Sequence, residues 1–369
     1  MSTPRHKVVQ WATGNTGLRA LREVIRHPSL DLAGVFVYDA AKDGVDAGEL
    51  CGEGPVGITA TTDRQAILDL RADCVSYMPR ATGTGPSRAG LTQAELLDDI
   101  VPMLESGTNI VTTCTDLFAR GRRLGEEGRA RVRAACEKGQ ASIWPSGSDP
   151  GFITETLAFA LLSVQRRIDC IEIEEHGDLS HRPSPHMVMD QMRFGKQLAG
   201  FDPDRRKTHL FGEYQPPLTV LADAAGFTID EWTATGGAAA ARHDTTIVSG
   251  EIKAGTAAAQ RVIITGRSGG AEVVRFTQYA YVTMDVDPAW DLRPTGWRVR
   301  VHGDAPFDID MAFPVPLDDL ADYVPAYNAN GPVNAIPYVC AAAPGILTTE
   351  DLPPVLPRGP RPAAADRRP

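Results

Sequence analysis

The sequence predicts an α/β protein with two domains, the first built on a parallel sheet and the second on a mostly antiparallel sheet. The 369 residues are 43% hydrophobic, which is enough apolar material for two separate cores. Before about residue 150, short apolar runs alternate with amphipathic segments. After about residue 226, long β-type runs are separated by glycine-rich turns instead.

The first part of the chain has the pattern of a parallel sheet covered by helices on both faces. The expected strands are KVVQWA, LAGVFVYD, ADCVSYM, NIVTTC and ASIWP. The expected helices are GLRALREVIRH, TQAELLDDIVPMLESG and EEGRARVRAACEKG. The strands are almost continuously hydrophobic, as they must be when both faces of a sheet are buried. We assign residues 1–150 to this domain.

The second domain, residues 151–328, is expected to combine helices with antiparallel strands. It opens with a helix over FITETLAFALLSVQ and a strand over IDCIEIEEHG, and HMVMDQMRFGKQLAG looks helical. The five β runs are FTIDEWTAT, TTIVSGEIKAG, AAQRVIITGRSGG, AEVVRFTQYAYVTM and GWRVRVHG. A helix is expected over residues 316–328. The Pro/Arg-rich tail, residues 354–369, is expected to lie extended or disordered.

Composition narrows the possible partners and the compartment. The formal net charge of −10 argues against nucleic acid and anionic membranes. No apolar run approaches the length that spans a bilayer, and the N-terminus lacks the apolar stretch of a signal peptide. The six cysteines form no CxxC pair, which favours reduced thiols over disulfides or zinc. We therefore expect a cytoplasmic protein without a metal.

The first strand–helix connection, Ala12-Thr13-Gly14-Asn15-Thr16-Gly17, resembles the glycine fingerprint of a dinucleotide-binding Rossmann domain. In that fingerprint one glycine allows the tight turn, a second lets backbone approach the pyrophosphate, and a third lets the helix pack closely on the strand. Gly14 and Gly17 keep the last two functions. Ala12 replaces the first glycine, which requires a negative φ or some strain. The position between a strand and a helix favours cofactor binding over a plain turn.

Asp39 and Lys42 follow the second strand and bear on the choice between NAD and NADP. Asp39 lies about 20 residues beyond Gly17, where a carboxylate accepts hydrogen bonds from the adenosine ribose. Such a carboxylate repels a 2′-phosphate and so favours NAD. Lys42, three residues further on, is able to attract that phosphate instead. The alternative interpretation of Asp39 is an acidic residue of an ordinary turn, with no contact to a cofactor.

Several segments together resemble the dihydrodipicolinate reductase-like superfamily. They are QWATGNTG, DAAKDGVDAGELCG, NIVTTCTDL, GSDPGF, DQMRFGK and VNAIPYVCAAAPGILTTEDLP, spread over residues 6–353. The branch that the sequence resembles most comprises 2,4-diaminopentanoate dehydrogenase and the native amine dehydrogenases. This resemblance implies NAD(P)-dependent interconversion of an amine with a ketone plus ammonia. It also implies a homodimer formed through the second domain, and a C-terminal segment, residues 329–353, that returns to the Rossmann domain.

The resemblance also assigns cofactor contacts. Asn334, in VNAIP, would lie near the nicotinamide as a candidate for its carboxamide. Met78 and Pro79 would flank the cofactor, although both are equally ordinary packing residues. Thr113 and Cys114, at the end of NIVTTC, are further candidates for cofactor contact.

The catalytic position departs from the family. In the amine dehydrogenases this strand end resembles Thr-Cys-Glu-Glu-Leu, and the first Glu handles ammonia and the imine; here that position is Thr115, followed by Asp116. A carboxylate can take the proton and stabilise the cationic imine, whereas Thr115 can only hydrogen-bond. Asp116 would replace the Glu only if the backbone rotates, because successive strand side chains point oppositely. The alternative for Asp116 is a helix cap.

The second domain supplies further candidates. His176 stands where dihydrodipicolinate reductases carry a His-His pair and a Lys, so their dicarboxylate substrate is not expected. His181 is a candidate proton donor, and the spacing of His176, His181 and His186 fits no usual zinc pattern. The candidate walls of an apolar substrate pocket are Trp144, Phe152, His176, Met187, Met192 and Phe194.

Two other functions remain open on the sequence alone. One is a carbonyl or imine reductase that does not use ammonia, with Thr115 or His181 as proton donor. The other is a cofactor-binding homologue that has lost catalytic activity. The absence of the family's Glu favours this second alternative.

Overall fold

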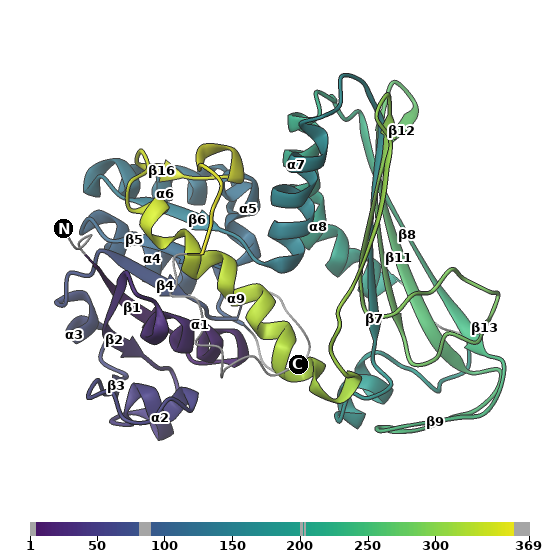
Figure 1. Ribbon diagram of the computed structural model, residues 1–369, viewed down its shortest axis with the longest axis horizontal. Helices are drawn as coiled ribbons and strands as arrows, with labels where there is room; N and C mark the ends of the chain where they lie inside the picture. Colours follow the sequence, from purple (N-terminus) through teal and green to yellow (C-terminus); the bar gives the residue numbers. More distant parts are fainter. Residues whose placement is uncertain (1–4, 81–89, 200–201, 203, 358–369) are drawn as a thin grey trace. The chain divides into compact units, whose positions relative to one another are not determined.

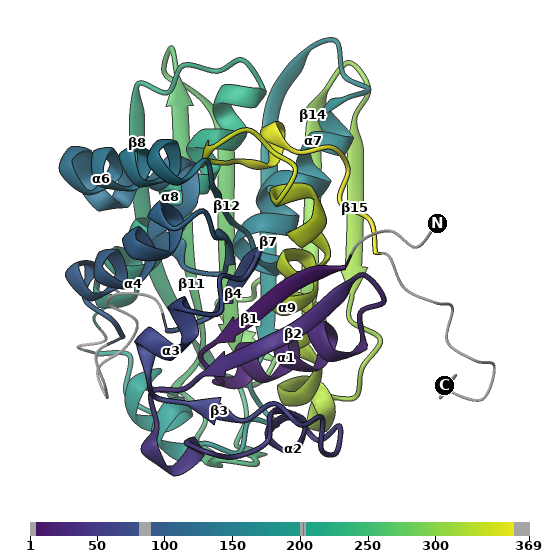
Figure 2. The ribbon, with the colours of Figure 1, turned by 90° about the vertical axis from the view of Figure 1, so that its left-hand side faces the viewer.

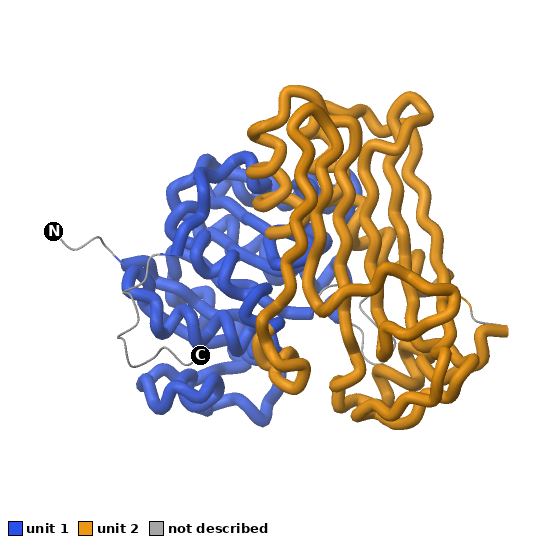
Figure 3. Tube along the Cα trace, turned by 45° about the vertical axis from the view of Figure 1, so that its right-hand side comes forward, with its two compact units in different colours: residues 1–151, 324–369 blue, residues 152–323 orange. Residues whose placement is uncertain are grey.

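A computed structural model describes residues 5–80, 90–199, 202 and 204–357. The chain forms two compact units (Figure 3): Met1–Gly151 together with Val324–Pro369, and Phe152–Tyr323. We call them unit 1 and unit 2. From residue 358 on, the tail expected to be extended or disordered lies outside the described residues.

Unit 1 contains a seven-stranded, fully parallel sheet in the order β16-β6-β5-β4-β1-β2-β3. The strands are β1 (His6–Trp11), β2 (Leu30–Phe36), β3 (Ala60–Thr61), β4 (Cys74–Tyr77), β5 (Asn109–Thr112), β6 (Ser142–Pro145) and β16 (Gly345–Ile346). Figure 2 shows β1, β2 and β3 side by side. The parallel Rossmann-type sheet predicted from the apolar runs is confirmed. The chain order reverses between β1 and β4, where ligands bind in such sheets.

Helices cover both faces of this sheet. On one face, α1 (Asn15–Arg26) and the C-terminal half of α9 (Leu320–Val339) share an apolar cluster with β1, β4, β5 and β6. On the other face lie α3 (Arg64–Leu68), α4 (Gln93–Glu105) and α6 (Gly125–Gly139). Short helices occupy the connections: α2 (Ala47–Cys51) and α5 (Phe118–Gly121). A helix was expected over residues 316–328. The observed helix, α9, begins at Leu320 and continues to Val339, within the part of the chain that belongs to unit 1.

Helix α1 sits unusually close to the turn that precedes it. A Cβ atom on Gly17 would come within 2.2 Å of the Ala12 carbonyl oxygen. Ala12 takes a φ of +72°, so the strained alternative is realised at the position where the fingerprint has its first glycine. The buried Gln10 side chain donates a hydrogen bond from Nε2 to the same Ala12 oxygen at 2.9 Å and holds the turn in this shape.

Unit 2 contains a second seven-stranded sheet in the order β13-β8-β11-β12-β7-β14-β15. Its strands are β7 (Ile168–Asp178), β8 (Glu231–Ala241), β11 (Ala257–Ser268), β12 (Ala271–Tyr281), β13 (Val286–Asp287), β14 (Gly296–Gly303) and β15 (Phe307–Ala312). β9 (Thr245–Ile247) and β10 (Gly250–Ile252) form a separate hairpin. Only β7 and β12 pair in parallel among the described strands of this sheet. The mostly antiparallel α+β domain predicted from the sequence is confirmed.

Helices α7 (Leu157–Leu162) and α8 (Asp204–Ala224) cover one face of this second sheet (Figure 1). Helix α8 was not predicted, because Pro216 and Pro217 inside it break the helical pattern. Phe276 and Tyr214 anchor it, with ring centroids 4.0 Å apart.

The opposite face of the second sheet carries paired charges. Arg300 contacts Glu172 at 2.6 Å and Glu174 at 2.7 Å, across neighbouring strands. Arg298 contacts Asp308 at 2.7 Å in the same way. This face, which we call the charged face, is built by the residues that alternate with the core residues along each strand.

One predicted element is wrong. The segment HMVMDQMRFGKQLAG is predicted to be helical, but over its described residues, up to 199, only a single helical turn, His186–Gln191, forms. Beyond this turn Arg193 and Gly195 take φ values of +60° and +77°, which are incompatible with a longer right-handed helix. The physical reason is Phe194, whose fully buried ring belongs to an apolar cluster with Val188 and draws the chain inward.

The sequence favoured reduced cysteines and no membrane-spanning helix. All six cysteines are free thiols. Among the described residues, no helix has both the length and the apolar character needed to cross a bilayer.

Candidate functional site

A pocket of about 690 Å³ lies in unit 1, beyond the carboxyl ends of β1, β2 and β4. Its lining comes from three connections: the turn into α1, the segment after β2 and the segment after β4. The lining residues are Ala12, Thr13, Gly14, Tyr38, Asp39, Ala40, Lys42, Met78, Pro79, Arg80, Gly90 and Leu91. Seven of the residues predicted to bind the cofactor are in this set, so the fold brings them together from distant parts of the chain.

The start of α1 is shaped to receive a phosphate group. Gly14 precedes the helix and gives it no side-chain cap, so the first amide groups stay available to an anion. A Cβ added to Gly14 would meet no atom within 4 Å, which leaves open space beside these amides. Asn15, Thr16 and Gly17 form the first turn of α1 behind this opening. These features fit the pyrophosphate of a dinucleotide.

Asp39 and Lys42 take distinct positions at the rim of the pocket. Asp39 accepts a hydrogen bond from the Ala41 amide through Oδ1 at 3.0 Å, and its carboxylate is exposed. The Lys42 ammonium donates to the Thr13 carbonyl oxygen at 2.8 Å and to the Thr13 hydroxyl at 3.2 Å. Lys42 therefore ties the segment after β2 to the phosphate-binding turn and places a positive charge beside it.

The ends of β4 and β5 contact each other next to the pocket. The Thr113 hydroxyl donates to the Met78 sulfur at 3.4 Å, and the Cys114 thiol donates to the Pro79 carbonyl at 3.8 Å. Burial raises the pKa of the Cys114 thiol to about 12, so this group remains a neutral thiol at physiological pH. Cys114 is thus suited to packing rather than to nucleophilic chemistry.

Thr115 and Asp116 lie in a polar cluster just beyond β5. The strand ends at Thr112 and residues 115–117 form a 3₁₀ turn, so the strand alternation expected for these two side chains does not apply. Arg123 donates to the Thr115 hydroxyl oxygen at 2.9 Å and lies 3.9 Å from the Asp116 carboxylate.

Asp116 is fully buried within this cluster. Gln93, on α4, donates to its carboxylate at 3.3 Å and to the Arg123 carbonyl oxygen at 2.9 Å. The helices that follow Asp116 have no side-chain cap, so the capping alternative does not describe it. Asp116 instead contacts Arg123, a residue that sequence reasoning missed because no motif marks it.

Helix α9 is anchored to the segment after β6. Asn328 accepts hydrogen bonds from the Ser148 amide at 2.9 Å and the Ser148 hydroxyl at 2.7 Å. The predicted residue, Asn334, lies six residues further along α9 and is half-buried and outside the pocket lining. Asn328 was overlooked because the same helix offers three asparagines without distinguishing them.

The two candidate histidines of unit 2 have different surroundings. His176 is buried in β7, stacks on Tyr279 with centroids 4.8 Å apart, and accepts a hydrogen bond from the Arg293 amide at 3.3 Å. His181 is exposed beyond β7 and contacts Asp318 at 2.7 Å. Their roles in proton donation and in the substrate pocket stay predictions.

The candidate pocket walls do not form one group. Trp144 packs in the apolar cluster beneath α9 in unit 1, and Phe194 is fully buried in a cluster of unit 2. Met192 packs against that second cluster, and Met187 is half-buried. Phe152 is 40% exposed, with its ring 6.1 Å from that of Trp297. A contact between any of them and a substrate remains a prediction.

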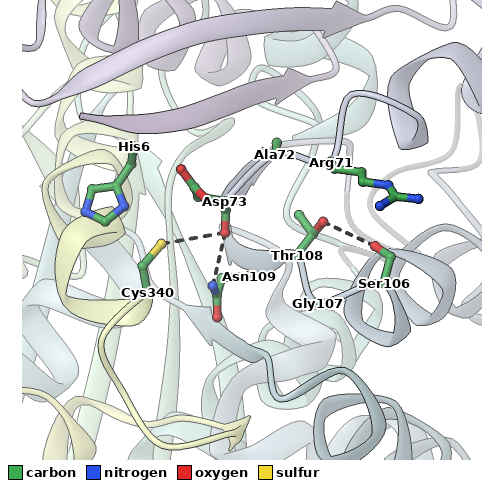
Figure 4. Close-up of a pocket in the computed structure, with 9 residues that line it drawn as sticks. All are labelled: His6, Arg71, Ala72, Asp73, Ser106, Gly107, Thr108, Asn109 and Cys340. Carbon is green, nitrogen blue, oxygen red and sulfur yellow. Dashed lines mark hydrogen bonds between the residues drawn. The ribbon is translucent and has the colours of Figure 1, made fainter. Parts of the chain in front are cut away.

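A second pocket, of about 310 Å³, lies at the amino ends of the strands (Figure 4). There the Asp73 carbonyl oxygen accepts hydrogen bonds from Asn109 Nδ2 at 3.0 Å and from the Cys340 thiol at 3.6 Å. The Cys340 contact fastens the residue after α9 to the residue before β4, and the Asn109 contact joins that residue to β5. The described residues contain no group of three or more His, Cys, Asp or Glu suited to a metal ion.

The comparisons with known proteins agree with this geometry. The family model for the 2,4-diaminopentanoate dehydrogenase C-terminal domain matches residues 152–359. An amine dehydrogenase of Streptomyces virginiae is 29% identical over 358 residues, which are 94% of this chain and 95% of the relative.

Solved structures extend the likeness of the fold. The amine dehydrogenase of Mycobacterium smegmatis has a TM-score of 0.69 at 16% identity, over 95% of this chain and 97% of its own. Scyllo-inositol dehydrogenase from Lactobacillus casei, solved with NAD(H) and scyllo-inositol, has a TM-score of 0.52 at 10% identity, over 90% and 89% of the two chains.

The fold and its carboxyl-end pocket define an NAD(P)-dependent oxidoreductase. More narrowly, the chain belongs to the 2,4-diaminopentanoate dehydrogenase family, as the resemblance in the sequence predicted.

The position of Asp39 leads to a prediction on cofactor preference. Replacement of Asp39 by Ser keeps a hydroxyl that can accept from the Ala41 amide, but removes the charge that repels a 2′-phosphate. The ratio of NADPH to NADH affinity should rise by about tenfold or more, because juxtaposed like charges are costly. Calorimetric titration with both cofactors measures it. The control is Asp43→Ser, whose carboxylate binds Thr62 instead; wild-type protein that already prefers NADPH would contradict this assignment.

Proposed function

We propose that this protein interconverts an amine with a ketone and ammonia. In the oxidative direction, an alkylammonium ion, NAD(P)+ and water give a ketone, an ammonium ion, NAD(P)H and a proton. The observation that carries this proposal is the end-to-end similarity to an amine dehydrogenase, which spans 94% of the chain. Scyllo-inositol dehydrogenase shares only the fold, at 10% identity, whereas the Streptomyces amine dehydrogenase is also similar in sequence, at 29% identity over this length.

The reaction needs a group that exchanges a proton with the substrate nitrogen. When bound, the nicotinamide supplies or accepts the hydride; the chain must supply the acid–base chemistry and the charge. Thr115 stands just beyond β5, where the resemblance places the catalytic side chain. Its oxygen already accepts from Arg123, so its own proton is left to donate to a substrate nitrogen or oxygen. A hydroxyl polarised by a guanidinium is a stronger donor than a free one.

In this proposal Asp116 compensates the positive charge of Arg123. Its carboxylate lies 3.9 Å from Arg123 and is fully buried, so it offsets the guanidinium charge beside Thr115. Without that compensation a positive charge would disfavour a cationic imine at the same place. The geometry thus supports a role for Asp116 through Arg123 more directly than a role as the base itself.

A second function is favoured by one contact, the hydrogen bond from Arg123 to Thr115. A guanidinium beside the reacting group stabilises the negative charge that develops on a carbonyl oxygen during reduction. This is the arrangement expected of a carbonyl reductase that does not use ammonia. It is therefore the alternative to amine chemistry in this site.

Cofactor oxidation with a ketone panel, with and without ammonium, tests the function. Amine chemistry predicts NADH or NADPH oxidation that requires ammonium, and cofactor reduction with the matching amines. Oxidation that is independent of ammonium would instead establish carbonyl reduction. If the protein binds the cofactor but converts no ketone or amine, it is a cofactor-binding protein without catalytic activity.

Variants at residues 115 and 116 test the assignment of the proton donor. Thr115→Val keeps the shape but removes the hydroxyl, so kcat/KM should fall about 100-fold, as for loss of a positioned acid. Asp116→Asn should lower kcat/KM less and leave cofactor affinity unchanged. An equal or greater loss in Asp116→Asn would instead make Asp116 the base. Activity untouched by either change would move the chemistry elsewhere, with His181 the next candidate.

We infer that the protein is a cytoplasmic homodimer that associates through the charged face of unit 2. The free thiols suit a reducing compartment. Along β11, Val262 and Ile264 enter the core, whereas Ile263 alternates onto the charged face. A second copy packed on this face would remove from water both Ile263 and the open edges of a broad sheet.

Light scattering measures the assembly. The wild-type protein should have a mass near twice the 39.6 kDa of one chain. Ile263→Glu should shift it toward the monomer, because an unpaired carboxylate would be buried at the interface. Val164→Glu, at an exposed position after α7, is the control and should leave the mass unchanged. A wild-type mass near that of one chain at micromolar concentration would refute the dimer.

A further inference from the structure

Tyr38 is the one large aromatic side chain in the described lining of the cofactor pocket. It follows β2 and directly precedes Asp39, the residue assigned to the adenosine ribose. The side chain is 45% exposed, although the hydroxyl at its tip is enclosed by protein groups. An aromatic ring that is open to a pocket while its polar tip is satisfied is a ready apolar surface for a ligand.

The hydroxyl of Tyr38 is held from both sides. It accepts a hydrogen bond from Trp11 Nε1 at 2.9 Å and donates one to the Asp99 carboxylate at 2.8 Å. Asp99 is itself fixed, since its side chain is fully buried, accepts from Tyr77 at 2.8 Å and contacts Arg64 at 2.7 Å. Burial and the Asp99 charge raise the pKa of the Tyr38 hydroxyl, so it stays protonated and continues to donate.

The ring of Tyr38 is supported along one edge as well. It meets Phe36 edge-on, with centroids 5.0 Å apart and an interplanar angle of 87°. Phe36 in turn stacks on Trp11 at 3.9 Å, and the Arg64 guanidinium lies about 6 Å from both rings, at 6.0 Å from Trp11 and 5.9 Å from Phe36. Two hydrogen bonds and one ring contact therefore restrict the orientation of Tyr38 before any ligand arrives.

We propose that the ring of Tyr38 is the surface on which the adenine base of the cofactor stacks. The base is bonded to the ribose that Asp39 is positioned to hold, so it must lie against a neighbouring part of the same lining. Leu91, after β4, belongs to that lining and is a candidate for the other side of the base. Because the ring is already oriented, stacking costs little side-chain entropy.

The proposal depends on cofactor binding in this pocket and not on the amine reaction, so it is tested by binding alone. The ligands are ADP-ribose, which carries adenine, and nicotinamide mononucleotide, which does not. Replacement of Tyr38 by Leu should weaken ADP-ribose about tenfold, as expected for loss of one aromatic–base stack, and leave nicotinamide mononucleotide unchanged. Calorimetry measures the first ligand and displacement of NADH fluorescence measures the second.

The matched variant is Tyr38→Phe, which keeps the ring but removes the hydrogen bonds to Trp11 and Asp99. It should weaken ADP-ribose only about threefold, because the ring is present but no longer fixed. Unchanged ADP-ribose affinity in Tyr38→Leu overturns the proposal, and so does an equal loss for both ligands.

A second measurement covers the case in which Tyr38→Leu fails to fold. In the wild-type protein with ring-labelled tyrosine, AMP should show intermolecular NOEs from its adenine H2 or H8 protons to the Tyr38 ring. Assignment of that signal by its loss in Tyr38→Phe spectra identifies the ring. A bound AMP with no such NOE overturns the proposal.

Discussion

The close approach of α1 to the turn before it is the constraint on which the cofactor site depends. With Gly17 only a hydrogen atom stands between the helix and the Ala12 carbonyl oxygen, where a Cβ would be 2.2 Å away. This packing fixes the helix axis against β1 and points its first amides into the pocket. The left-handed φ of Ala12 is maintained by the same contact, because Gln10 and the helix both hold that peptide. Thr13, Lys42 and the rest of the lining take their places around a turn that cannot relax.

The sequence predicted the fold well where local pattern and tertiary structure agree. The five long strands of the first sheet and helices such as α1 and α4 follow from apolar periodicity alone, because each buries the face that its pattern marks. The pattern failed where a few residues override it. Pro216 and Pro217 hid α8, and Phe194 pulled a helix-like segment into irregular backbone.

The candidate site divides in the same way. Gly14 and Asp39 could be located from spacing, since both belong to one strand–helix–strand unit whose geometry is common to many proteins. Arg123 and Asn328 could not, because each meets its partner across a stretch of chain with no fixed spacing. The proposed chemistry depends on such a contact, because the hydroxyl of Thr115 accepts a hydrogen bond from a residue eight positions later. A substitution at a catalytic position is therefore hard to interpret until the charges around it are known.

The division of unit 1 into two separated stretches has a consequence for how the protein is made. The apolar face formed by Val8, Val111 and Trp144 is covered by Val333 and Ile336 of α9, which are synthesised only after the whole of unit 2. At ordinary rates of translation the ribosome takes roughly ten to thirty seconds to make the intervening chain. During that interval the nascent sheet lacks both α9 and its edge strand β16. Unit 2 is continuous and can be completed first, so the core of unit 1 closes only when its last helix has been synthesised.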